Sequence, residues 1–137
     1  MFIDSVVWIG AKLKRDQWHE KSVPIINKFL NKEINIVYVT DYIVLESVNF
    51  LLRKAGFEVA LETLNLFRIH ERIKIINIDG GLFERSCEIF AKYPGLSITD
   101  ASIVAAMEKV RVKKLYSFDG GFDKIKWVER QEELRIG

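Results

Sequence analysis

Five acidic residues stand at places where carboxylates could act together. Asp4 and Asp119 each end a short apolar run typical of a β-strand, and Asp41 follows a third such run. Glu46 and Asp100 are instead embedded in longer apolar stretches. Ligands of open parallel sheets bind beyond the carboxyl ends of the strands, so acids at these positions are candidates for a site.

The chemistry open to such a cluster depends on how its charge is neutralised. Carboxylates held together repel one another and bind protons more tightly, unless a hard cation compensates their charge. Mg²⁺ and Mn²⁺ are such cations. They bind phosphate oxygens, lower the pKa of a coordinated water and stabilise a leaving oxygen. The pattern therefore predicts metal-dependent hydrolysis of phosphodiester bonds.

Each acid also has a simpler explanation. Asp100 opens a helical run that is apolar on nearly all sides, where Thr99 or Asp100 itself could cap the helix, an effect of about 1 kcal/mol. Glu46 shares a helical stripe with Arg53, which is also typical of a solvated face. Asp4 could cap the element that follows it. Both interpretations remain open at this point.

The elements that would position these acids alternate along the chain. Short runs rich in β-branched and aromatic residues predict strands at 2–4, 36–39, 73–76 and 115–118, with a weaker fifth at 126–129. Amphipathic stretches predict helices at 6–18, 22–32, 41–54, 58–70, 81–92 and 100–112. This alternation is typical of an α/β domain with a mainly parallel sheet, and no linker or repeat divides it. We expect a single domain over residues 1–137.

Composition narrows the class of protein. The chain has 137 residues, 49% of them hydrophobic and 29% charged, which suits one soluble globular core and excludes disorder. No apolar run approaches the roughly 20 residues of a membrane helix, so we expect neither a membrane span nor a signal peptide. The single cysteine, Cys87, cannot form an internal disulfide and fits a reducing cytoplasm. The net charge of +2 does not by itself indicate a polyanionic partner.

Four segments together match a known pattern: Phe2-Ile3-Asp4-Ser5, Val44-Leu45-Glu46, Leu96-Ser97-Ile98-Thr99-Asp100-Ala101 and Ser117-Phe118-Asp119-Gly120-Gly121-Phe122. In order and spacing they resemble the PIN-domain ribonucleases, in particular the small toxins of VapC type, over nearly the whole chain. The resemblance implies a three-layer α/β/α domain with a four- to five-stranded parallel sheet. It also implies that Asp4, Glu46, Asp100 and Asp119 meet at the carboxyl edge as catalytic metal ligands. One or two Mg²⁺ or Mn²⁺ ions would activate a water that attacks RNA.

Several other residues could support such a site. The hydroxyls of Ser5, Thr99 and Ser117 could orient metal or water, although each also fits a cap or a turn. Asp123, one helical turn beyond Asp119, is a candidate ligand for a second metal, or a solvated helix residue. The family often has a small polar residue two places after its first aspartate, whereas this chain has Val6. That departure reduces the expected support for the metal.

Partners are indicated less directly. Lys12, Lys14 and Arg53 could contact RNA phosphates near the cleft, although a solvated surface is the more common role. The helix pair 41–54 and 58–70 has more apolar positions than one buried face requires, which often marks an interface. The resemblance to VapC-type proteins implies a homodimer and a cognate antitoxin protein that occupies a groove near the active site.

Two other functions are alternatives to the ribonuclease. A PIN-like module that binds RNA or protein without cleavage would have no reason to keep four mutually repelling carboxylates. A phosphatase of the haloacid-dehalogenase type needs a second aspartate two residues after the first, where Val6 stands. Asp41 and Asp79 also end strands, but they do not match metal-binding positions of the family. We assign both to capping, which makes them controls for mutagenesis.

Overall fold

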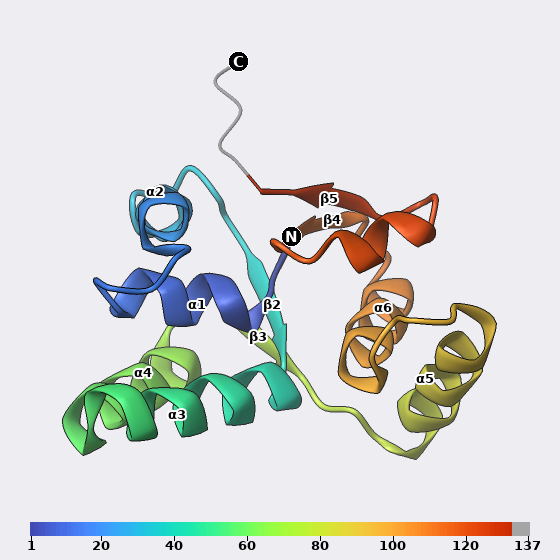
Figure 1. Ribbon diagram of the computed structural model, residues 1–137, viewed down its shortest axis with the longest axis horizontal. Helices are drawn as coiled ribbons and strands as arrows, with labels where there is room; N and C mark the ends of the chain where they lie inside the picture. Colours follow the sequence, from blue (N-terminus) through green and yellow to red (C-terminus); the bar gives the residue numbers. More distant parts are fainter. Residues whose placement is uncertain (133–137) are drawn as a thin grey trace.

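A parallel sheet of five strands runs through the centre of the computed structural model, which describes residues 1–132 (Figure 1). The strands are β1 (Phe2–Ile3), β2 (Val37–Thr40), β3 (Ile73–Ile76), β4 (Lys114–Tyr116) and β5 (Glu129–Gln131). Their order is β3-β2-β1-β4-β5, and every neighbouring pair is parallel. All five carboxyl ends therefore lie at one edge of the sheet.

Helices cover both faces of the sheet (Figure 1). They are α1 (Ser5–Lys12), α2 (His19–Leu30), α3 (Asp41–Ala55), α4 (Phe57–Ile69), α5 (Gly80–Lys92) and α6 (Ile98–Val110), with a short 3₁₀ helix, η1 (Gly120–Lys124). The first four lie on one side, and α5 and α6 lie on the other. Right-handed crossovers require this division, because β1, β2 and β3 advance in one direction and β4 and β5 lie beyond β1 in the other. The α/β/α fold is as expected.

Two expected helices are wrong at their boundaries. The helix expected at 6–18 ends at Lys12, and the helix expected at 22–32 begins at His19. Between them the Asp16 carboxylate accepts a hydrogen bond from the Trp18 N–H at 2.9 Å, which forms a turn. The His19 ring then bonds the Gly10 carbonyl at 2.8 Å and ties the start of α2 to α1. These contacts break a polar run that would otherwise suit a helix.

Two further boundaries near the carboxyl edge differ from expectation. The helix expected at 100–112 begins at Ile98, since the Ser97 hydroxyl caps it. The fifth strand lies at 129–131 rather than 126–129. Residues 125–128 are held in a turn by the Val128 N–H, which donates to the Ile125 carbonyl at 3.1 Å.

The core anchors the helices that carry the acids. Trp8 of α1 donates from its indole nitrogen to the Ile3 carbonyl at 3.1 Å and packs edge-on against Phe29 and Phe67. Residues 101–107 of α6 are all buried, so this helix cannot rotate without exposing apolar surface. The starts of α1 and α6 are thereby fixed against the sheet. None of the helices within residues 1–132 combines the length and apolar character needed to cross a membrane.

Candidate active site

Asp4 lies at the centre of the site, at the end of β1 and the start of α1. Its Oδ1 accepts a hydrogen bond from the Ser5 N–H at 2.7 Å, and its Oδ2 accepts one from the Ser117 hydroxyl at 2.8 Å. The parallel pairing of β1 with β4 brings Ser117 to this point, because the Asp4 N–H donates to the Tyr116 carbonyl at 3.0 Å. Asp4 is only 5% exposed. Its carboxylate is held rigidly on both sides.

Glu46 reaches the same place from the second turn of α3. The Ser5 hydroxyl donates to Glu46 Oε2 at 3.0 Å and lies 3.4 Å from Asp4 Oδ1. One hydroxyl therefore stands between two carboxylates that are 42 residues apart in the chain. Glu46 itself is exposed, so it forms the solvent side of this pair.

Asp100 and Asp119 come from the other side of the sheet. The Asp100 N–H donates to the Ser97 hydroxyl at 3.0 Å, so Ser97, and not Thr99 or Asp100, caps α6. The Asp100 carboxyl therefore does not serve as the helix cap. Asp119 follows β4, where its N–H donates to the Ser117 hydroxyl at 3.1 Å, and its Oδ1 accepts from the Gly121 N–H at 2.8 Å. Ser117 thus connects Asp119 to Asp4.

The pKa values of Asp4 and Asp100 are both raised in the folded protein. Burial raises the pKa of Asp4 to about 6, with a further contribution from the charges of Glu46 and Asp119, against the opposing hydrogen bonds of Ser117 and Ser5. Burial, the charge of Asp4 and a carboxyl–carboxyl hydrogen bond with Asp119 raise the pKa of Asp100 to about 7. The structure therefore brings the four acids together as one electrostatic cluster.

No basic side chain within residues 1–132 compensates this charge. None of the four acids forms an ion pair there, whereas other acids do. Asp123 is held by two bonds of 2.9 Å from the Arg130 guanidinium, which lower the pKa of its carboxyl. Asp79 faces Lys109 at 3.7 Å. Asp123 and Asp79 thus each face a cation, whereas the four acids of the cluster face none among the described residues.

A hard dication suits this set of donors. All four are carboxylates, the ligand type that Mg²⁺ and Mn²⁺ favour. A bound dication would offset the burial and the like-charge repulsion that raise the pKa values of Asp4 and Asp100. In residues 1–132 no three acidic, histidine or cysteine side chains already converge on one point that an ion could occupy. The donors fit in kind. Ser5 lies between the Asp4 and Glu46 carboxylates, and the Ser117 hydroxyl links the Asp4 carboxylate to the Asp119 backbone N–H.

The family model described as PIN domain matches residues 1–128. The chain belongs to the PIN domain family. No curated protein shows a significant match to the sequence.

Solved structures share the fold of this PIN domain. VapC20 of Mycobacterium tuberculosis, described as a sarcin-ricin loop cleaving toxin, superposes with a TM-score of 0.78 at 20% identity, over 91% of this chain and 94% of that chain. A toxin–antitoxin complex from Klebsiella pneumoniae gives a TM-score of 0.70 at 19% identity, over 97% of this chain and 98% of that chain. VapBC2 of Rickettsia felis, bound to a DNA fragment from its promoter, gives a TM-score of 0.69 at 13% identity, over 95% of this chain and 96% of that chain. The three-layer fold inferred from the sequence resemblance is confirmed.

The basic residues expected at the site of the PIN domain lie away from the acids. Lys12 pairs with Glu62 of α4 at 3.3 Å. Arg53 is exposed two helical turns beyond Glu46, about 10 Å along α3, and its guanidinium lies 5.8 Å from the Phe50 ring centre. Lys14 is exposed in the loop after α1. The structure brings none of these three cations into the acidic cluster.

Of the two acids assigned to capping, Asp79 caps a helix and Asp41 does not. Asp79 accepts from the Leu82 N–H at 2.9 Å and caps α5. Asp41 accepts from the Ile78 N–H at 3.1 Å and joins the start of α3 to the segment after β3, while Thr40 caps α3. Both acids serve backbone donors outside the cluster. They remain suitable controls.

Arg130 is a supporting residue that sequence reasoning missed. Besides binding Asp123, it donates to the Ser117 carbonyl at 3.1 Å and so braces the loop that carries Ser117 and Asp119. Hydrogen bonds to Asp123 and Glu132 raise its pKa. No periodicity marks this arginine, because it belongs to β5, the strand with the weakest sequence signal.

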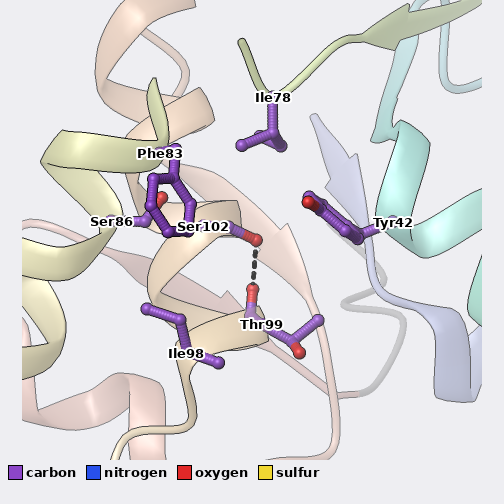
Figure 2. A pocket seen from close by; sticks show the side chains of 7 residues that line it. All are labelled: Tyr42, Ile78, Phe83, Ser86, Ile98, Thr99 and Ser102. Atoms are coloured by element: carbon purple, nitrogen blue, oxygen red, sulfur yellow. Dashed lines mark hydrogen bonds between the residues drawn. The ribbon is translucent and has the colours of Figure 1, made fainter. Parts of the chain in front are cut away.

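An apolar cavity of about 150 Å³ adjoins the cluster on the α5 and α6 side (Figure 2). Tyr42 and Phe83 face each other across it, and Ile78, Ile98 and Thr99 complete the walls. The Thr99 carbonyl accepts from the Ser102 hydroxyl at 2.5 Å. The Thr99 hydroxyl has no hydrogen-bond partner among residues 1–132, and the residue lines this cavity beside Asp100.

Proposed function

We propose that this PIN domain is a metal-dependent endoribonuclease that cleaves RNA phosphodiester bonds with a metal-activated water. The observation that supports this most is the cluster of Asp4, Glu46, Asp100 and Asp119, which no cation of residues 1–132 neutralises. A structural role alone would not account for it, since burying like charges together costs stability.

The roles within the site follow from its contacts. A bound Mg²⁺ or Mn²⁺ would supply a polarised water and positive charge opposite the phosphate. The four acids would hold it, with Asp4 as the buried anchor. Ser117 fixes Asp4 Oδ2, and Ser5 orients Asp4 and Glu46 relative to each other. Arg130 donates to the Ser117 carbonyl and so holds the segment that carries Ser117 in place.

Cleavage of a mixed RNA pool tests this function. We expect wild-type protein to cut the pool with Mg²⁺ or Mn²⁺ and a chelator to stop it. Asp4→Asn and Asp100→Asn should reduce the rate by at least about a hundredfold, because each removes a metal-binding charge. The matched variant Asp79→Asn, which alters a capping acid outside the cluster, should stay near the wild-type rate.

The same assay addresses a second function, a non-catalytic PIN-like module that binds RNA or protein. The lack of a ready three-ligand arrangement within residues 1–132 is the observation that favours it. RNA binding without any metal-dependent cleavage would support that module. Cleavage by wild type that persists in Asp4→Asn would contradict the proposed chemistry.

We further infer that the chain is the toxin of a toxin–antitoxin pair in the cytoplasm. Support comes from its fold, shared with the toxin–antitoxin complex from Klebsiella pneumoniae. A small reading frame beside its gene, whose product relieves growth arrest caused by this protein, would be the expected antitoxin. Growth arrest by wild type but not by Asp4→Asn is the corresponding prediction.

The proposed assembly is a homodimer. Apolar side chains stand exposed on α3 and α4, among them Leu45 at 58%, Phe57 at 67% and Leu61 at 41%. Exposed apolar surface of this kind favours association. Sedimentation should give twice the mass of one chain, and a monomer at micromolar concentration would contradict the dimer.

A further inference from the structure

A basic hollow lies at the far end of the two helices that begin at the acidic cluster. Its volume is about 430 Å³, and it is lined by Leu13, Lys14, Arg15, Asp16, Phe50 and Lys54. Three of these residues are cations and one is an acid. Within residues 1–132, Lys14, Arg15 and Lys54 form no ion pair, while Asp16 binds the Trp18 N–H at 2.9 Å. The hollow thus carries uncompensated positive charge.

An aromatic ring lies in this basic surrounding. Phe50 is half-buried, and the Arg53 guanidinium lies 5.8 Å from its ring centre. Proteins that bind single-stranded nucleic acid combine cations, which contact the phosphates, with aromatic rings, on which the bases stack. Lys54 also complements the dipole at the end of α3. That simpler role does not explain why Lys14, Arg15 and the ring of Phe50 gather beside it.

The hollow and the acidic cluster share one seam between α1 and α3. At one end Ser5 donates to Glu46 at 3.0 Å, and at the other end Lys14 and Lys54 line the same hollow. Glu46 and Lys54 are eight residues apart on α3, which is about 12 Å of helix. A few nucleotides of a single strand span that distance.

We propose that this hollow binds the single-stranded RNA segment that flanks the cut. Lys14, Arg15 and Lys54 contact its phosphates, and one base stacks on Phe50. This role rests on the proposed function, because it assumes that the acids cleave the same strand. An acidic protein segment would use the cations but would gain nothing from stacking on the ring.

The test compares two triple variants of equal net charge. Lys14→Gln/Arg15→Gln/Lys54→Gln removes the cations of the hollow, and Lys74→Gln/Lys113→Gln/Lys126→Gln removes three other exposed cations. The probe is a fluorescent single-stranded RNA oligonucleotide of mixed sequence, titrated in chelator so that metal-dependent cleavage cannot occur. Anisotropy gives Kd over a range of salt concentrations.

We expect the hollow variant to bind at least about tenfold more weakly than wild type at low salt. The slope of log Kd against log salt should fall by about 2, because roughly 0.7 counterions are released for each neutralised phosphate of a single strand. The control variant should keep the wild-type slope. Equal loss of affinity in the two triple variants would overturn the proposal, because net charge alone would then explain the weaker binding.

Phe50→Leu tests the stacking step, with Leu52→Ala as a control on the same helix. Phe50→Leu should weaken RNA binding about tenfold and leave binding of poly-glutamate unchanged. If wild type binds poly-glutamate as tightly as RNA, and Phe50→Leu changes neither, the surface is one for acidic proteins and the RNA proposal is wrong.

Cleavage assays separate this proposal from the function on which it rests. Asp4→Asn should bind the oligonucleotide like wild type and fail to cut it. Wild type that binds through the hollow but never cleaves would overturn the proposed ribonuclease and leave the RNA site standing. If the wild type cleaves RNA but the hollow variant binds RNA as tightly as the wild type does, the proposed RNA site is wrong. The proposed ribonuclease function would then be unaffected.

Discussion

At the scale of single residues, Asp4 shows how one carboxylate takes two roles. Oδ1 caps α1 through the Ser5 N–H, and Oδ2 accepts from Ser117, which follows β4. The sequence predicts both a cap and a cluster acid but offers no means of combining them. Because the two oxygens have different partners, the cap does not prevent Asp4 from lying in the acidic cluster.

Ser117→Ala tests how far this anchoring matters. Loss of the hydroxyl removes a bond to buried Asp4 and should raise the pKa of Asp4 further, because that bond favours the ionised form. We expect the free energy of unfolding to fall by about 1–3 kcal/mol at pH 7.5 and by less at pH 5. Urea unfolding at both values provides the measurement.

Ser86→Ala is the matched control, because Ser86 is equally buried but bonds the Leu82 carbonyl of its own helix. Its effect should be small and independent of pH. A Ser117→Ala variant whose loss is the same at both pH values would mean that the hydroxyl does not act through Asp4.

Residue patterns cannot decide where α6 begins or whether Asp100 caps it. Thr99 and Asp100 both carry side-chain acceptors suited to a helix cap, so the sequence predicts a start at one of these two residues. Packing places the first turn at Ile98, where the Ser97 hydroxyl meets the Asp100 N–H. The Asp100 carboxyl is therefore not the cap, and it lies in the cluster with Asp4 and Asp119.

At the scale of elements, the contact between α1 and α2 depends on a glycine. Gly10 is buried, and a Cβ built there would lie 2.5 Å from the Ser22 Oγ and 3.2 Å from the Trp18 carbonyl oxygen. The two helices can approach this closely because Gly10 has no side chain. The Ser22 hydroxyl is itself buried without a hydrogen-bond partner in residues 1–132.

Gly10→Ala should therefore destabilise the protein by about 1–3 kcal/mol, although alanine favours a helix in isolation. Ser22→Ala should be neutral or stabilising, since it removes an unsatisfied buried hydroxyl. Thermal unfolding of both variants checks the pair. An alanine at position 10 that stabilises the fold would show that α1 and α2 are not packed as described.

Elements were easier to predict than their ends. The alternation of strand and helix patterns predicted the parallel sheet, because each pattern reflects burial over many residues. The turn at 13–18 was missed, since Lys14 to Gln17 reads as a polar helix face. The bonds that end α1 there come from His19 and Asp16, whose partners only the folded chain reveals.

At the scale of the whole molecule, charge is separated along the α1–α3 seam. A net charge of +2 conceals an acidic cluster at one end and a basic hollow at the other. Composition alone could not predict this, because the residues involved are scattered along the chain. The topology brings the acids together at the carboxyl edge of the sheet and gathers the cations at the far ends of α1 and α3.

Protonation of the cluster gives the metal-free protein a distinctive stability profile. The pKa of Asp4 rises from 3.8 to about 6 on folding, and that of Asp100 rises to about 7. Folding therefore favours the protonated forms. Their contribution to stability is complete below about pH 4 and is lost as the pH rises toward 7.

For Asp4 the loss should be on the order of 2 kcal/mol, and Asp4→Asn should flatten the curve between pH 4 and 7 by that amount. Urea unfolding in chelator over this range measures it. A wild-type profile parallel to that of Asp4→Asn would contradict the raised pKa of Asp4.

The central claim, that four separated carboxylates form one metal site, is tested most directly by calorimetric titration with Mn²⁺. We predict binding to wild type and to Asp79→Asn with equal affinity, and at least about a tenfold loss in Asp4→Asn and Asp100→Asn. Equal heats and affinities in all four proteins, or no binding to wild type, would contradict the account.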